Sequence, residues 1–255
     1  GGILSKANNL DVIGSEIGIT NGTNQPAGNF TINLSGSLNV RAGSFFPSLI
    51  RALSQGPASS AGMSVTAHEI VITDGASVST STLTEGDAGP LNISAVNLEV
   101  TNAGRISSAS RQGLDPDTGE PAGPAPTGNA GTINIQGLGG PTQSVLIDGV
   151  DSAILTNTVG TGHGGSINIA SQSLQIQNSG TLSAATSGTA SSATGGTITV
   201  NAEHVALNSQ GLITAETNGI APAGTVDINT GTLALNSGGQ IRSSSGVKPT
   251  FVSKA

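Results

Sequence analysis

The feature that most constrains this chain is a motif, Gly-x-apolar-x-apolar, that recurs mostly at intervals of about 28 to 34 residues. Seven copies are present, and in six of them the glycine lies two residues before the first apolar position. The paired apolar positions are Phe30 and Ile32, Met63 and Val65, Leu91 and Ile93, Ile133 and Ile135, Ile167 and Ile169, Ile198 and Val200, and Val226 and Ile228. An internal period of this length predicts a repeat protein in which each unit stacks on the next.

Each copy is followed by a second alternating apolar pair and then by a third apolar position. The second pairs are Leu38 and Val40, Ile70 and Ile72, Leu98 and Val100, Val145 and Ile147, Leu174 and Ile176, Val205 and Leu207, and Leu233 and Leu235. The third positions are Phe46, Val78, Ile106, Ile154, Leu182, Ile213 and Ile241. Because alternation with a period of two predicts strands with one buried face, each repeat is expected to form three short strands.

The spacing between the strands excludes helices from most connections. The first and second pairs are seven residues apart in five of the seven copies, whereas a helical crossover between parallel strands needs a dozen residues or more. The predicted fold is therefore all-β, a right-handed parallel β-helix of three sides and about seven to eight coils. We expect a single domain over 1–255, with a degenerate first coil or cap at 1–27, seven coils at 28–245 and a tail or cap at 246–255.

The composition agrees with a narrow, repetitive interior. Hydrophobic residues make up 35% of the chain but aromatic residues only 2%, so the core is expected to consist of small aliphatic side chains. The 38 glycines supply tight turns at short intervals.

Insertions interrupt the repeat at three places. The segment between Ile106 and Ile135 is rich in Pro, Gly and Asp, which predicts an exposed loop. A shorter insertion, from Gln136 to Ser144, enters the same coil at its first corner. The segment from Pro47 to Gln55 has Pro at its start and Gly just past its end, so we expect a short amphipathic helix there, packed on the coil through Leu49, Ile50 and Leu53.

Charge and hydropathy argue against two classes of partner. The formal net charge is −7 with only eight Lys and Arg residues, so the basic stripe that neutralises phosphates is missing and nucleic-acid binding is not expected. No run approaches the roughly 20 apolar residues that span a bilayer, so membrane insertion is not expected either. The chain contains no Cys, which excludes disulfides and thiolate metal sites.

The sequence does not indicate catalytic chemistry, and we expect no enzyme activity and no cofactor. Sugar-cleaving enzymes on β-helices need clustered carboxylates, and the acids here are scattered over different coil positions. The best concentration is Asp115, Asp117 and Glu120, near Arg111. This cluster has the chemistry to bind calcium or a glycan, but we favour a solvated loop. Together with Arg51 of the helical insert, these residues are the candidate interaction sites.

Units such as GGSINIASQSLQIQNSGTLSAATSG and GGTITVNAEHVALNSQGLITAETNG resemble the repeats of filamentous-haemagglutinin-like exoproteins of two-partner secretion systems. The resemblance covers residues 28 to 245. It implies export through an outer-membrane partner transporter, a place on the bacterial surface or in the medium, and a role in adhesion or aggregation. The family's N-terminal secretion domain, with its Asn-Pro-Asn signatures, is not evident in this sequence.

Three functional hypotheses follow. The first is a rigid stalk whose exposed loops bind a host, neighbour-cell or matrix surface, because loops on a rigid scaffold commonly carry function. The second is a filament subunit that binds copies of itself end to end, because the terminal coils of a β-helix expose unpaired strand edges. The third is a glycan-binding or glycan-degrading β-helix, which predicts carboxylates and a basic residue converging on one face.

Overall fold

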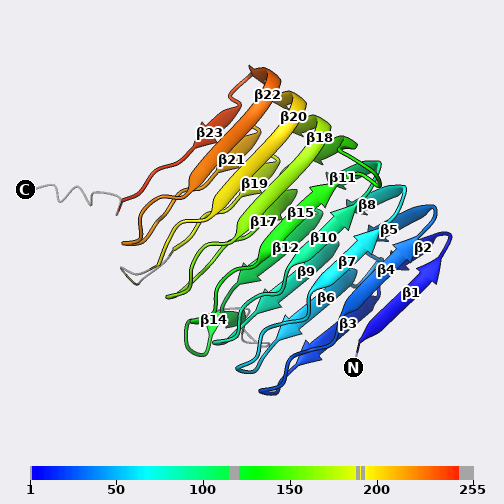
Figure 1. Ribbon diagram of the computed structural model, residues 1–255, viewed down its shortest axis with the longest axis vertical. Coiled ribbons are helices and arrows are strands. Elements are labelled where there is room, and N and C mark those ends of the chain that lie inside the picture. The colour runs from blue at the N-terminus through cyan, green and yellow to red at the C-terminus, as the bar shows by residue number, and fades with distance from the viewer. Residues whose placement is uncertain (1, 115–120, 188–189, 191–192, 247–255) are drawn as a thin grey trace, which may run out of the picture.

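The chain folds into a parallel β-solenoid, seen in a computed structural model that describes residues 2–114, 121–187, 190 and 193–246 (Figure 1). Each coil contributes one strand to an eight-stranded sheet, so these residues form eight coils. Consecutive coils lie side by side in chain order from one end of the molecule to the other (Figure 1). The fold class predicted from the repeat is confirmed. Within the part of the chain that the structure describes, no helix is long and apolar enough to cross a membrane.

The first strand of each coil is the one that carries the repeated motif in seven of the eight coils. These strands are β1 (Ile3–Ala7), β4 (Phe30–Leu34), β7 (Met63–Thr66), β10 (Leu91–Ser94), β15 (Thr132–Gln136), and the opening parts of β18 (Ser166–Gln177), β20 (Thr197–Leu207) and β22 (Thr225–Leu235). The second strands are β2 (Leu10–Ile13), β5 (Ser37–Arg41), β8 (Glu69–Thr73), β11 (Asn97–Thr101), β16 (Thr142–Asp148), and the closing parts of β18, β20 and β22. First and second strands belong to one sheet, because the last three run through the first corner without a break.

The third strands form a separate sheet, here called the third-strand sheet. Its members are β3 (Glu16–Asn21), β6 (Leu49–Ser54), β9 (Ser77–Thr82), β12 (Arg105–Ser110), β17 (Ala153–Leu155), β19 (Thr181–Ser183), β21 (Leu212–Thr214) and β23 (Gln240–Arg242). All of their pairings are parallel. The remaining strands, β13 (Gly113–Leu114) and β14 (Pro121–Ala122), form a short antiparallel hairpin after β12.

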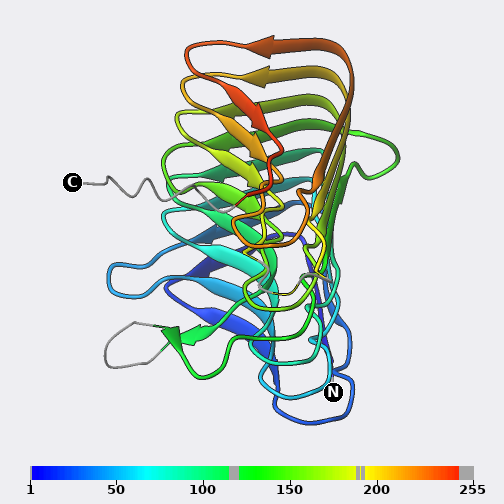
Figure 2. The same cartoon turned by 90° about the vertical axis from the view of Figure 1, so that its left-hand side faces the viewer.

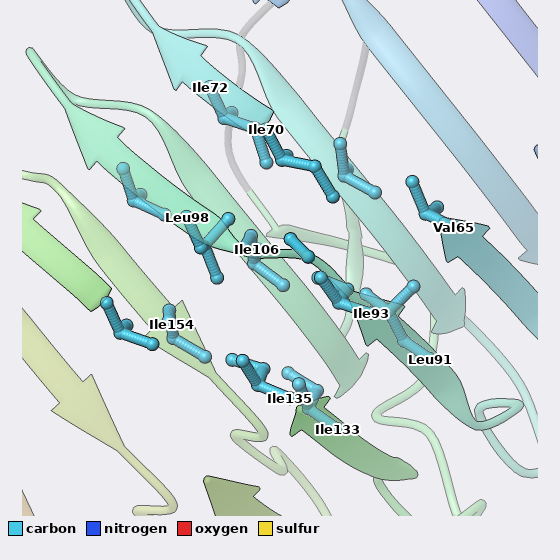
Figure 3. Packing of buried hydrophobic residues seen from close by; sticks show 14 of the residues in the cluster. Val65, Ile70, Ile72, Leu91, Ile93, Leu98, Ile106, Ile133, Ile135 and Ile154 are labelled. Atoms are coloured by element: carbon cyan, nitrogen blue, oxygen red, sulfur yellow. The ribbon is translucent and has the colours of Figure 1, made fainter. Parts of the chain in front are cut away.

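The core is a stack of equivalent apolar side chains. Ile93 pairs with Val65 of the preceding coil and with Ile135 of the following one, and all three are buried. Figure 3 shows these side chains and their neighbours from the other two strands pointing into one interior. Burying one such side chain contributes roughly 1.5 to 3 kcal/mol, so the repetition of the motif accounts for a continuous core along the axis.

The second corner has its own local signature. Asn102 and Ala103 both adopt positive φ angles, of 48° and 63°, and the pair Asn178 and Ser179 repeats this turn at 52° and 68°. Two successive left-handed residues reverse the chain tightly, and Asn tolerates this conformation better than most side chains do. The turn sends the chain from the second strand into the third within a few residues.

The predicted helix over Pro47–Gln55 is wrong, because Leu49–Ser54 is strand β6. Ile50 lies between Ile17 and Val78 of the adjacent coils and is buried, and Leu53 is buried as well. A short isolated helix is marginal in water, whereas this segment gains backbone hydrogen bonds from a strand on each side. The third anchor of this coil is therefore Ile50, and Phe46, predicted to be that anchor, is 70% exposed.

The insertions lie at corners of the coil. The insertion in the second coil falls at the second corner, in the loop formed by residues 42–48 between β5 and β6. The insertion after Ile135 enters at the first corner, between β15 and β16, where the Gly137 N–H donates to the Gly140 carbonyl over 2.8 Å. Figure 2 shows loop 42–48 and the β13–β14 hairpin projecting on the same side of the solenoid.

Candidate binding groove

A groove of about 520 Å³ runs over the outer face of the third-strand sheet. Alternate residues of a strand point to opposite faces, which decides the side chains that can line this groove. Thus Ile50, Val78 and Ile106 point into the core, while their sequence neighbours point outward. The polar side chains that line the groove include Arg51, Ser77, Ser79, Arg105, Ser107, Arg111, Asn157, Ser187 and Asn218, and the apolar side chains of Leu49, Leu155 and Val159 line it as well. We call this site the arginine groove.

Three arginines supply the positive charge of the groove. Arg51 Nε donates to Glu16 Oε1 over 2.7 Å, and Arg105 Nη2 lies 3.4 Å from Asp151 Oδ1. The Arg111 guanidinium makes no ion pair or side-chain hydrogen bond with any other described residue. Arg111 therefore brings a charge that no described carboxylate compensates.

Arg111 is exposed to solvent, yet neighbouring groups disfavour its charge. Desolvation by the surrounding protein, and then the positive charge of Arg51, lower the pKa of Arg111. Arginine nevertheless stays protonated at neutral pH, because its ordinary pKa lies so far above 7. An anion in the groove would relieve the repulsion between the two guanidinium groups.

Two hydroxyl groups in the wall of the groove lack partners. Ser81 Oγ and Ser110 Oγ are buried and make no hydrogen bond within the described residues. Buried polar groups in folded proteins usually have a partner, so such exceptions call for an explanation.

The structure brings together only part of the predicted site. Arg51 and Arg111 line the same groove, although Arg51 reaches it from a strand and not from a helix. Asp115, Asp117 and Glu120 lie outside the described residues. Sequence reasoning missed Arg105 and the row of serines. Their positions next to the third anchors, as Ser107 follows Ile106, indicate that their side chains lie on the outer face of the sheet.

The outer face of the first strands offers a contrasting surface. Asn134 Nδ2 donates to Asn92 Oδ1 over 2.8 Å, and Asn168 Nδ2 donates to Asn134 Oδ1 over 2.9 Å. Side-chain ladders of this kind stabilise stacked parallel strands. Because these amides bond to one another, the ladder accounts for them without a ligand.

Two of the three histidines contact hydroxyl groups. His163 Nδ1 lies 3.0 Å from Thr194 Oγ1, and His204 Nδ1 lies 2.8 Å from Thr232 Oγ1. Among the residues that the structure describes, no group of three or more His, Cys, Asp or Glu side chains is placed to hold a metal ion.

Comparison with family models, with curated proteins and with solved structures finds no match to this chain.

Proposed function

We propose that this chain is a non-catalytic β-helical rod of a bacterial exoprotein, exported through an outer-membrane partner transporter, that mediates adhesion or aggregation at the cell surface. The proposal combines the sequence resemblance with the architecture. A continuous core gives a stiff support, and the excursions from it lie on the outside. Surface loops on such a scaffold are free to carry binding residues.

The observation that carries this proposal is the exposure of Phe45 and Phe46 in loop 42–48. Phe45 is 90% exposed and Phe46 70% exposed. The chain has only four Phe and no Tyr or Trp, so half of its aromatic residues lie in solvent on one projecting loop. Aromatic side chains are enriched in the buried centres of protein interfaces, and this pair contributes nothing to the core.

Attachment of protein-coated beads tests the proposal. Beads carrying the full chain are counted on layers of bacterial and epithelial cells, beside beads carrying the double variant Phe45→Ser, Phe46→Ser. We expect the wild-type beads to attach and the double variant to attach severalfold less. Because both side chains are exposed, the thermal unfolding temperature is expected to stay unchanged.

Leu138→Ser is the matched control. Leu138 is 50% exposed and lies in the loop between β15 and β16, at a different corner of the coil. Its replacement also removes an exposed apolar side chain, and attachment is expected to persist. Wild-type beads that attach no better than bare beads would contradict the proposal.

A second candidate function, end-to-end assembly into a filament, is supported by the last described coil. Leu233 and Leu235 of β22 are each 45% exposed, whereas the equivalent Val205 and Leu207 of β20 are buried. A further coil stacked there would cover both leucines. Light scattering and electron microscopy of the purified chain at several concentrations distinguish the cases, because a filament grows with concentration and a single rod does not.

A further inference from the structure

We propose that the arginine groove binds a linear polysaccharide that carries carboxylate or sulfate groups. This inference rests on the proposed function, because both require the outside of the rod to bind a surface. It uses a different site, because the groove lies on the sheet and the Phe45 and Phe46 pair lies on a loop.

Charge is the first argument. The chain has 15 acidic and eight basic residues, yet three of the basic residues line this one groove. Among the described residues, no carboxylate lines it. Arg51 and Arg105 each have one acidic partner at the rim, and Arg111 has none among the described residues. The acidic protein as a whole repels anions at long range. A local cluster of positive charge therefore attracts an anion to this groove and not to the rest of the surface.

Shape is the second argument. The lining extends from Arg51 in the second coil to Asn218 in the seventh. At a strand spacing of about 4.8 Å this is a path of about 24 Å along the axis. A path of this length accommodates several units of a linear polymer. Polar side chains lie along it, and Ser79 and Ser107 occupy equivalent positions on adjacent coils. Ser79, Arg105 and Ser107 are held on strands, which limits the conformational entropy that they lose on binding. Arg111 and Asn157, in contrast, lie just beyond strand ends.

The lining chemistry favours a sugar over other linear anions. Ser79, Ser107 and Asn157 provide donors and acceptors that match sugar hydroxyl groups. No aromatic side chain is among the described lining residues, so stacking of nucleic-acid bases has no platform. An extended peptide usually binds by adding a strand at a sheet edge, whereas this groove lies over a sheet face.

Dextran and its charged derivatives test the proposal on a single polymer backbone. Binding of the full chain to neutral dextran, carboxymethyl dextran and dextran sulfate is measured by titration calorimetry at low salt. We expect binding of one or both charged forms and none of the neutral form. Because separated charges are screened by salt, the affinity is expected to fall when sodium chloride is raised to about 0.5 M.

Arg111→Gln is the decisive variant. It removes the charge that no described carboxylate compensates, and the loss of a charge-assisted hydrogen bond predicts an affinity at least about tenfold lower than that of the wild type. Arg41→Gln is the matched control, because Arg41 is exposed, ends β5 and does not line the groove. Unchanged thermal unfolding of both variants establishes that they fold.

Several outcomes would overturn the inference: no binding of either charged dextran, equal loss in the Arg41 and Arg111 variants, or equal binding of single-stranded DNA or polyglutamate. Failure of the proposed function is measured separately, because the bead variant alters loop 42–48 and leaves the groove intact. Loss of bead attachment with retained dextran sulfate binding would identify two independent sites.

Discussion

Gly104 approaches the preceding coil so closely that a Cβ built on it would lie 2.1 Å from the carbonyl oxygen of Ile72. The equivalent glycines of later coils are in the same situation. Their Cβ atoms would lie 2.5 Å from the carbonyl oxygen of Ile147 for Gly180, and 2.2 Å from that of Ile176 for Gly211. These contacts are with backbone, which cannot swing aside. Glycine at this corner therefore allows successive coils to stack at the strand spacing.

The variant Gly104→Ala is expected to lower the free energy of unfolding by about 3 kcal/mol, because overpacking against backbone forces the coils apart. Urea denaturation measures the change. Gly140→Ala is the control, since a Cβ on Gly140 meets no atom within 4 Å, and it is expected to change stability by less than about 0.5 kcal/mol. Similar losses in both variants would show that the close approach at Gly104 is not the cause.

Replacement of Ile50 and Phe46 tests which of the two residues is the third anchor of this coil. Ile50→Ala is expected to cost about 2 to 5 kcal/mol, because it leaves a cavity between Ile17 and Val78. Phe46→Ala is expected to cost less than about 0.5 kcal/mol, because Phe46 is 70% exposed. If Phe46 were the anchor of this coil, the order of the two losses measured by denaturation would be reversed.

The sequence predicts the coils well because each anchor must be an apolar side chain that packs on the equivalent side chains of the adjacent coils. Leu91, for example, has apolar partners in Met63 and Ile133, and periodicity alone reveals all three. Periodicity fails to place the third anchor next to loop 42–48. An insertion moves the third anchor from the expected position of Phe46 to Ile50, and Pro47 is compatible with a helix start as well as with the approach to a strand.

The arginine groove was only half predictable for a related reason. Arg51 and Arg111 stand out in a chain with few basic residues, but their proximity depends on the register of β6 against β9 and β12. Arg105 carries no local motif and is significant only because it shares their face. The outward residues of successive coils can be recognised as one surface only when the third anchors of those coils are aligned correctly.

The hydroxyl groups inside the solenoid make unequal contributions to stability. Thr80 and Thr156 occupy equivalent buried positions, two coils apart. Thr80 Oγ1 donates to the Gly89 carbonyl over 2.5 Å, whereas Thr156 Oγ1 has no partner within the described residues. Thr80→Val is expected to cost about 1 kcal/mol, and Thr156→Val is expected to be neutral or stabilising. Equal losses in thermal denaturation would indicate that Thr156 has a bound water as its partner.

Glu16→Gln is expected to affect binding more than folding. Its carboxylate accepts the hydrogen bond of Arg51 Nε, but the side chains of the pair are 43% and 30% exposed, so its loss is expected to cost less than about 1 kcal/mol. Removing the acid leaves Arg51 uncompensated in the arginine groove. We therefore expect the affinity for dextran sulfate, measured by titration calorimetry, to rise severalfold.

The control for this prediction is Glu99→Gln, which makes the same change of net charge on the exposed face of β11, away from the groove. A purely long-range effect of protein charge would raise the affinity equally in both variants, and salt would abolish the difference from wild type. A rise confined to Glu16→Gln assigns the effect to Arg51. An equal rise in both variants would mean that the anion responds to the charge of the whole rod and not to this groove.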